Sequence, residues 1–138
     1  MRILVLCTGN SARSQMAEGL LRSLSKGAVD VHSAGTKPAR VNPLAIEAMN
    51  EVGIDISGQR SKSVEEFKGQ YFDVVITVCD KAKESCPIFP GAPERIHWSY
   101  LDPAAVEGNH DERLRAFRSV RDDLRVKLQG LLDSRHPA

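Results

Sequence analysis

Cys7-Thr-Gly-Asn-Ser-Ala-Arg13-Ser14 is the stretch that lies between an apolar run and an amphipathic segment. The preceding run, Arg2–Cys7, is apolar from Ile3 onward, which is typical of a buried strand of a parallel sheet. From Ser11 onward the apolar residues recur at helical spacing, at Met16, Ala17, Leu20, Leu21 and Leu24. This predicted helix ends near Lys26-Gly27, since a basic residue followed by glycine is a common end for a helix. Strand, tight turn and helix in this order predict the opening of an α/β fold.

The rest of the chain continues this alternation of strands and helices. Further strands are predicted over Val29–Ala34, over Phe72–Cys79 and near Arg95–Trp98. Helices are predicted from Asn42-Pro43 to Gly53, over Ser63–Phe67 and over Asp111–Asp133. These elements predict an α/β fold, a three-layer α/β/α sandwich with a central four-stranded parallel sheet. At roughly 100–200 residues per domain, residues 1–138 are expected to form a single domain.

The loop after Cys7 has the residues of an oxyanion site. A short loop between a strand and a helix turns its backbone N–H groups inward, beside the positive end of the helix dipole. Gly9 and Asn10 tolerate a left-handed backbone, and Arg13 offers a planar fork for two oxyanion oxygens. The expected cradle consists of Thr8, Gly9, Asn10, Ser11, Ala12, Arg13 and Ser14.

Cys7 is the candidate nucleophile of this loop. A helix N-terminus and a nearby arginine both stabilise a thiolate, and Ser14 is placed to donate a hydrogen bond to the sulfur. Because the carboxyl ends of parallel strands form the binding edge of such sheets, Cys7 and Cys79 are both expected there. The sequence therefore predicts cysteine chemistry on a bound oxyanion.

Composition excludes several other classes of protein. Nineteen basic and eighteen acidic residues leave a net charge of +1, and aromatic residues make up 5%, so a nucleic-acid-binding protein is not expected. No segment approaches the roughly 18 apolar residues of a membrane span, and the first apolar run is too short for a signal peptide. A cytoplasmic location is expected. Disulfides are rare there unless they are catalytic or redox-sensing, which points to chemistry for the three cysteines.

No resident cofactor or metal is expected. The four histidines lack metal-ligand spacing, and the three cysteines are dispersed. There is no glycine fingerprint for a dinucleotide, so NADPH is expected to act only through a separate protein.

Cys7-Thr-Gly-Asn-Ser-Ala-Arg-Ser-Gln-Met-Ala-Glu18 resembles the signature loop of the low-molecular-weight protein tyrosine phosphatases and of the arsenate reductases built on the same fold. The thioredoxin-coupled arsenate reductases are the most similar. The resemblance covers nearly the whole chain. It extends through Ser33-Ala-Gly35, Val41-Asn-Pro43, Ala45-Ile-Glu-Ala-Met49, Ile54-Asp-Ile-Ser57, Cys79, Cys86-Pro87, His97-Trp98 and Asp102-Pro103.

The additional cysteines favour a reductase within this family. A phosphatase needs one nucleophile and water, whereas a reductase must pass on two electrons and needs a second thiol. Cys79 and Cys86 are separated by a polar segment of six residues, 80–85, which contains good helix formers. A helix would hold the two cysteines about 10 Å apart, beyond the roughly 4.4–6.8 Å Cα spacing of a disulfide. The segment would therefore have to unwind before Cys79 and Cys86 could form a disulfide.

The resemblance implies a relay of three cysteines. Cys7 attacks arsenate, Cys79 attacks the Cys7 sulfur as arsenite leaves, and Cys86 then attacks Cys79. The resulting Cys79–Cys86 disulfide is reduced by thioredoxin. Asp102, followed by Pro103, matches the general acid of the family. The aromatic residues that follow this position in phosphatases are replaced by Ala104-Ala105-Val106, which favours a small inorganic oxyanion over phosphotyrosine.

Two positions depart from the family pattern. Ala12 stands where related reductases often have another cysteine. Some relatives bind potassium through positions matching Asn10, Glu18 and Ser33 and an aspartate, but Lys62 stands at the aspartate position. Pairing of Lys62 with Glu18 would replace the ion.

Three alternatives remain open from the sequence. They are a tyrosine-phosphatase-like phosphohydrolase, a non-catalytic oxyanion-binding or redox-sensing module, and a reductase coupled to mycothiol or glutaredoxin. A monomer is expected, with arsenate and thioredoxin as its partners.

Overall fold

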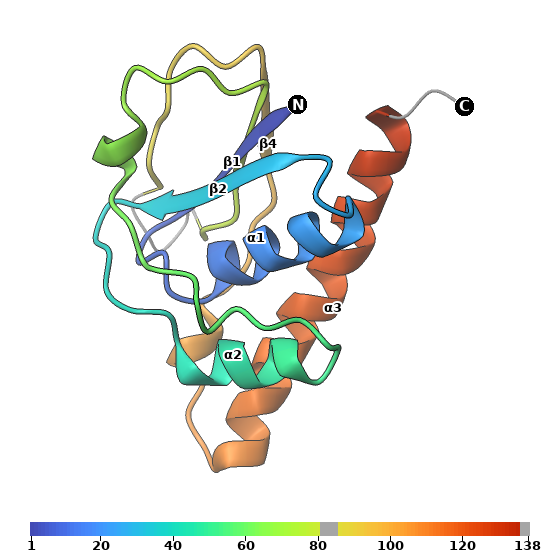
Figure 1. The fold of residues 1–138 in the computed structure, drawn as a ribbon. Helices are drawn as coiled ribbons and strands as arrows, with labels where there is room; N and C mark the ends of the chain where they lie inside the picture. Colours follow the sequence, from blue (N-terminus) through green and yellow to red (C-terminus); the bar gives the residue numbers. More distant parts are fainter. Residues whose placement is uncertain (81–85, 136–138) are drawn as a thin grey trace.

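The computed structural model describes residues 1–80 and 86–135. Its four strands form one sheet in the order β2-β1-β3-β4, and every neighbouring pair is parallel (Figure 1). Their bounds are Arg2–Cys7 for β1, Asp30–Gly35 for β2, Val74–Thr77 for β3 and Glu94–His97 for β4. The predicted α/β fold with a four-stranded parallel sheet is confirmed.

Three α-helices pack together on one side of this sheet (Figure 1). Helix α1 contacts β1 and β2 directly, and α3 packs on both α1 and α2. The described residues also contain two short 3₁₀ helices. The helical bounds are Arg13–Leu24 for α1, Pro43–Asn50 for α2, Val64–Phe67 for η1, Pro103–Ala105 for η2 and His110–Arg135 for α3. None of the described helices is both long and apolar enough to span a membrane.

Successive side chains of a strand point to opposite faces of the sheet, so an apolar core lies on each face. Ile3 and Val5 face the three α-helices, whereas Leu4 and Leu6 face the other side. In the described part of the chain, that second side is covered by η1 and loop segments, not by a long helix. Phe72 lies at its centre, and its ring meets those of Phe67 and Phe89 edge to face at 5.8 and 5.6 Å. Such contacts supply about 0.5–1.5 kcal/mol each beyond simple burial.

The sheet brings the predicted site residues to one edge. Strand β1 ends at Cys7, and the amide of Val78 donates to the carbonyl of Leu6, so that β3 delivers Cys79 at the same end. The strand predicted over Phe72–Cys79 is shorter in the structure, because β3 covers only Val74–Thr77.

Gly35, at the end of β2, lies against the loop that follows Cys7. A Cβ at this position would lie 2.4 Å from the carbonyl oxygen of Thr8 and 2.9 Å from the amide nitrogen of Asn10. Real Cβ atoms do not approach backbone so closely, so only glycine lets β2 and the loop pack together.

Candidate active site

The loop from Cys7 to Arg13 turns its carbonyl groups outward. The carbonyl oxygens of Thr8, Gly9 and Ser11 accept hydrogen bonds from the amides of Lys37, Ala39 and Asn42. In a trans peptide the N–H points opposite to the C=O, so the following amides point toward the loop centre. Helix α1 begins there, and its N-cap Ala12 provides no side-chain cap. The helix N-terminus, which has no side-chain cap, and the loop amides together favour an anion.

Asn10 holds the loop in shape. It is fully buried and has a positive φ of 45°, as predicted. Its side chain donates to the hydroxyls of Ser14 and Ser33 and accepts from the amide of Lys62. Gly9 also tolerates a left-handed backbone but does not adopt one, since its φ is not positive. The single left-handed residue Asn10 suffices to turn the chain, since its side chain replaces backbone hydrogen bonds.

Cys7 lies at the bottom of the loop and is 1% exposed. Its sulfur is 2.8 Å from the hydroxyl oxygen of Ser14. The Ser14 oxygen already accepts a hydrogen bond from the Asn10 amide group, which can only donate. When Cys7 is a thiolate, which has no proton to donate, the Ser14 hydroxyl donates to the sulfur and stabilises its charge.

A cavity of about 80 Å³ opens above this sulfur. Its walls include Ala12, Arg13, Asp102 and Ala104. Since a water molecule takes up about 30 Å³ in the liquid, the space suits a small inorganic oxyanion. Asp102 is half-buried and its carboxylate accepts the Ala104 amide, which caps η2. The structure thus brings Cys7, the loop, Arg13 and Asp102 to one cavity.

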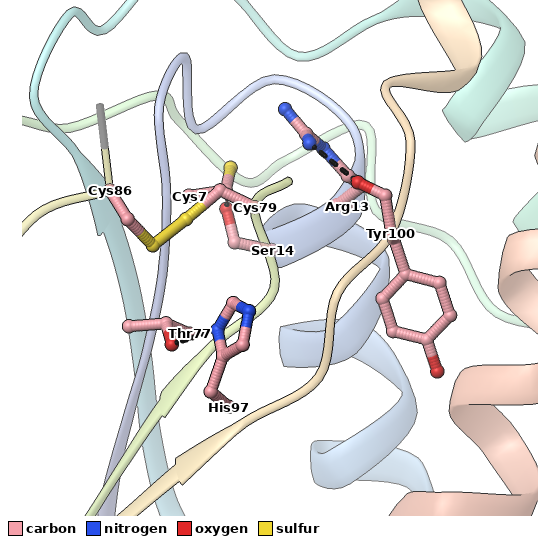
Figure 2. Close-up of a disulfide and its surroundings, with 8 residues drawn as sticks. All are labelled: Cys7, Arg13, Ser14, Thr77, Cys79, Cys86, His97 and Tyr100. Atoms are coloured by element: carbon pink, nitrogen blue, oxygen red, sulfur yellow. Dashed lines mark hydrogen bonds between the residues drawn. A yellow bond between two sulfur atoms is a disulfide. The ribbon is translucent and has the colours of Figure 1, made fainter. Parts of the chain in front are cut away.

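Tyr100 is a site residue that the sequence did not reveal. Its carbonyl oxygen accepts a 3.0 Å hydrogen bond from Nη1 of the buried Arg13 (Figure 2). Its hydroxyl donates to Asp123 on α3, and burial together with this carboxylate raises the pKa of Tyr100. Helix α3 thereby anchors the segment that holds Arg13. A backbone carbonyl leaves no residue-type signal, so no sequence motif could identify it.

Cys79 and Cys86 form a disulfide with a Cα separation of 6.0 Å (Figure 2). Cys79 is fully buried and packs in the same core cluster as Cys7, whereas Cys86 is partly exposed. The expected helix over 80–85 falls almost entirely outside the described residues. The Cα separation matches a disulfide and is shorter than the roughly 10 Å of two positions seven residues apart in a helix.

Lys62 lies in the position expected for an internal cation. Its ammonium is 3.7 Å from a carboxylate oxygen of the buried Glu18 and donates to the carbonyl of Arg60. The same Glu18 oxygen accepts a 2.7 Å hydrogen bond from Ser33. Burial lowers the pKa of Lys62, and the nearby Glu18 carboxylate opposes this shift. The predicted pairing of Lys62 with Glu18 is confirmed, and these residues do not fit a potassium ion because the ammonium occupies that place.

Comparison with known proteins agrees with this geometry. An arsenate reductase of Halalkalibacterium halodurans is 45% identical over 127 residues, which are 92% of this chain and 91% of that protein. A solved arsenate reductase in the oxidized state superposes with a TM-score of 0.82 at 35% identity, over 96% of this chain and 97% of the other. A thioredoxin-dependent arsenate reductase of Corynebacterium glutamicum has a TM-score of 0.71 at 26% identity, over 96% of this chain and 60% of the other.

The family model for low molecular weight phosphotyrosine protein phosphatases matches residues 2–136, almost the full length of the chain. Together with the relatives and the loop geometry, this match confirms the resemblance carried by the Cys7 loop. The chain belongs to the low molecular weight phosphotyrosine protein phosphatase family.

Proposed function

We propose that this protein is an arsenate reductase that uses Cys7, Cys79 and Cys86 in turn. The observation that carries the proposal is the disulfide Cys79–Cys86 beside a nucleophile buried in an oxyanion loop. A phosphatase has no use for two further thiols at this edge. The full-length similarity to enzymes named arsenate reductases supports the same conclusion.

The first step places arsenate in the loop cavity. The loop amides, the N-terminus of α1 and the Arg13 guanidinium neutralise its charge, and the Cys7 thiolate attacks arsenic. Asp102, on the cavity wall, protonates the departing oxygen so that it leaves as water. The product is a covalent adduct of arsenate on the Cys7 sulfur.

The second step moves two electrons onto arsenic. The Cys79 thiolate attacks the Cys7 sulfur, the sulfur–arsenic bond breaks with its electron pair, and arsenite leaves. The Cys86 thiolate then attacks Cys79 and releases Cys7 as a thiolate. The disulfide in the structure corresponds to the end of this sequence. Since Cys86 is more exposed than Cys79, the relay carries the oxidation outward.

The reductant that we propose is thioredoxin, in the cytoplasm. Its dithiol has a reduction potential of about −270 mV, which is low enough to reduce an exposed disulfide. The thioredoxin-dependent relative from Corynebacterium glutamicum supports this choice. A reducing compartment keeps Cys7 and the other thiols available for the next turnover.

Arsenate-dependent consumption of NADPH tests the proposal. We expect steady consumption with thioredoxin and thioredoxin reductase, and none with the Cys7→Ser variant. Parallel assays replace thioredoxin by glutaredoxin with glutathione, or by the mycothiol system. Turnover only in these assays would refute thioredoxin coupling while leaving arsenate reduction intact. Hydrolysis of aryl phosphates without any arsenate reduction would refute the reductase and favour the phosphatase.

Potassium is expected to change neither the thermal stability nor the turnover of this protein. The Lys62 ammonium already neutralises Glu18, so an added cation gains no binding site. Thermal unfolding and turnover are measured in KCl and NaCl of equal ionic strength. The Lys62→Asp variant is the matched test, because it restores the carboxylate of the family pattern, and its stability should rise with potassium concentration. A clear potassium response of the unmodified protein would contradict the prediction.

A further inference from the structure

A second, larger cavity borders the disulfide and has no role in the proposed reaction. It measures about 320 Å³, within the roughly 300–1,000 Å³ range of small-molecule sites. Val75, Ile96 and Phe89 supply an apolar floor, and Cys86 forms part of the wall. It lies at the β3–β4 side of the sheet, whereas the oxyanion cavity lies at the Cys7 loop.

Arg95 supplies a positive charge to the wall of this cavity, and His97 is a second basic side chain there. Arg95 is exposed on β4, and its neighbour Glu94 is engaged by Arg135. Among the described residues that line the cavity, none is acidic. The Nδ1 atom of His97 and the hydroxyl of Thr77 are hydrogen-bonded at 2.6 Å, which fixes the imidazole below the disulfide in the view of Figure 2. The charge of the wall therefore favours an anionic occupant.

Accessibility determines which sulfur such an occupant meets. Cys79 is fully buried, whereas Cys86 is partly exposed and lines the cavity. A thiolate in the cavity therefore reaches Cys86 Sγ, and the Cys79 sulfur is the leaving group.

We propose that this cavity binds a small thiol that carries a carboxylate and directs it to form a mixed disulfide with Cys86. The thiolate forms a bond to Cys86 Sγ, the Cys79–Cys86 bond breaks, and Cys79 leaves as a thiolate that takes a proton from water. The Arg95 guanidinium attracts the carboxylate and orients the thiol. The proposal rests on the disulfide and the cavity alone, so it stands or falls independently of arsenate reduction.

The test compares thiols of similar size and different charge on the oxidised protein without arsenate. These are 3-mercaptopropionate, 2-mercaptoethanol and cysteamine. Each rate per thiolate concentration is divided by the rate at which the same thiolate cleaves an uncharged low-molecular-weight disulfide, because a more basic thiolate is intrinsically the better nucleophile. Cleavage is followed by alkylation of the released cysteine and intact mass. At low ionic strength we expect the anionic thiol to react about fivefold faster than the neutral one, and the cationic thiol to be the slowest. Added salt should reduce the difference.

Arg95→Gln should remove this charge preference, whereas Arg125→Gln should keep it, because Arg125 is exposed on α3 and does not line the cavity. To capture the product, a Cys7→Ser, Cys79→Ser double variant is incubated with the symmetric disulfides of the same thiols. The adduct of mercaptopropionate on Cys86 should predominate. Equal rates for all three thiols, or a preference that survives Arg95→Gln, would overturn the proposal.

Discussion

Cys86→Ser is expected to convert arsenate reduction into a single turnover that ends with Cys7 joined to Cys79. The variant retains the nucleophile and its first partner, so one arsenite leaves for each protein molecule. The buried Cys79 then has no thiol to which it can pass the oxidation. Rapid-quench measurement of arsenite should give a burst of one equivalent, and mapping of the disulfide should give a Cys7–Cys79 peptide.

Two further variants separate the steps. Cys79→Ser should release no arsenite at all, because nothing attacks the Cys7 sulfur, yet any hydrolysis of aryl phosphates at the Cys7 loop should remain. Cys7→Ser should lose both activities. Sustained turnover of Cys86→Ser with thioredoxin would show that the third cysteine is unnecessary and would refute the relay.

Arg13→Lys should lower kcat/KM for arsenate by about 10²–10³-fold, the usual cost of removing one preorganised oxyanion donor. The buried guanidinium is held by the Tyr100 carbonyl and lines the cavity above Cys7. Lysine keeps the charge but cannot offer two parallel N–H donors, so charge alone does not rescue the variant. Steady-state kinetics with arsenate and the affinity for inorganic phosphate both report the loss.

Arg115→Lys is the matched control, since Arg115 is exposed on α3 and lies outside the cavity. It should leave kcat/KM unchanged. Circular dichroism and thermal unfolding verify that Arg13→Lys is folded. A folded variant that retains its affinity for phosphate and its kcat/KM would exclude Arg13 from oxyanion binding.

Local sequence patterns predicted the elements next to the site well. Helix α2 begins as expected, with Asn42 accepting the Leu44 amide and Pro43 in the first turn. The pairing of Lys62 with Glu18 followed from charge complementarity within the family pattern. Gly9 does not use the left-handed backbone that it tolerates, because glycine permits a positive φ but does not require it.

The order of strands and helices, the Cys7 loop and the roles of the three cysteines could be predicted from residue patterns, because hydrophobic period, turn residues and residue types are local properties. How these parts meet in space follows from the folded chain. The Tyr100 carbonyl on Arg13, the close approach of Gly35 to Thr8 and the second cavity beside Cys86 all join segments distant in the chain. Such contacts depend on backbone positions and packing, which residue type alone does not specify.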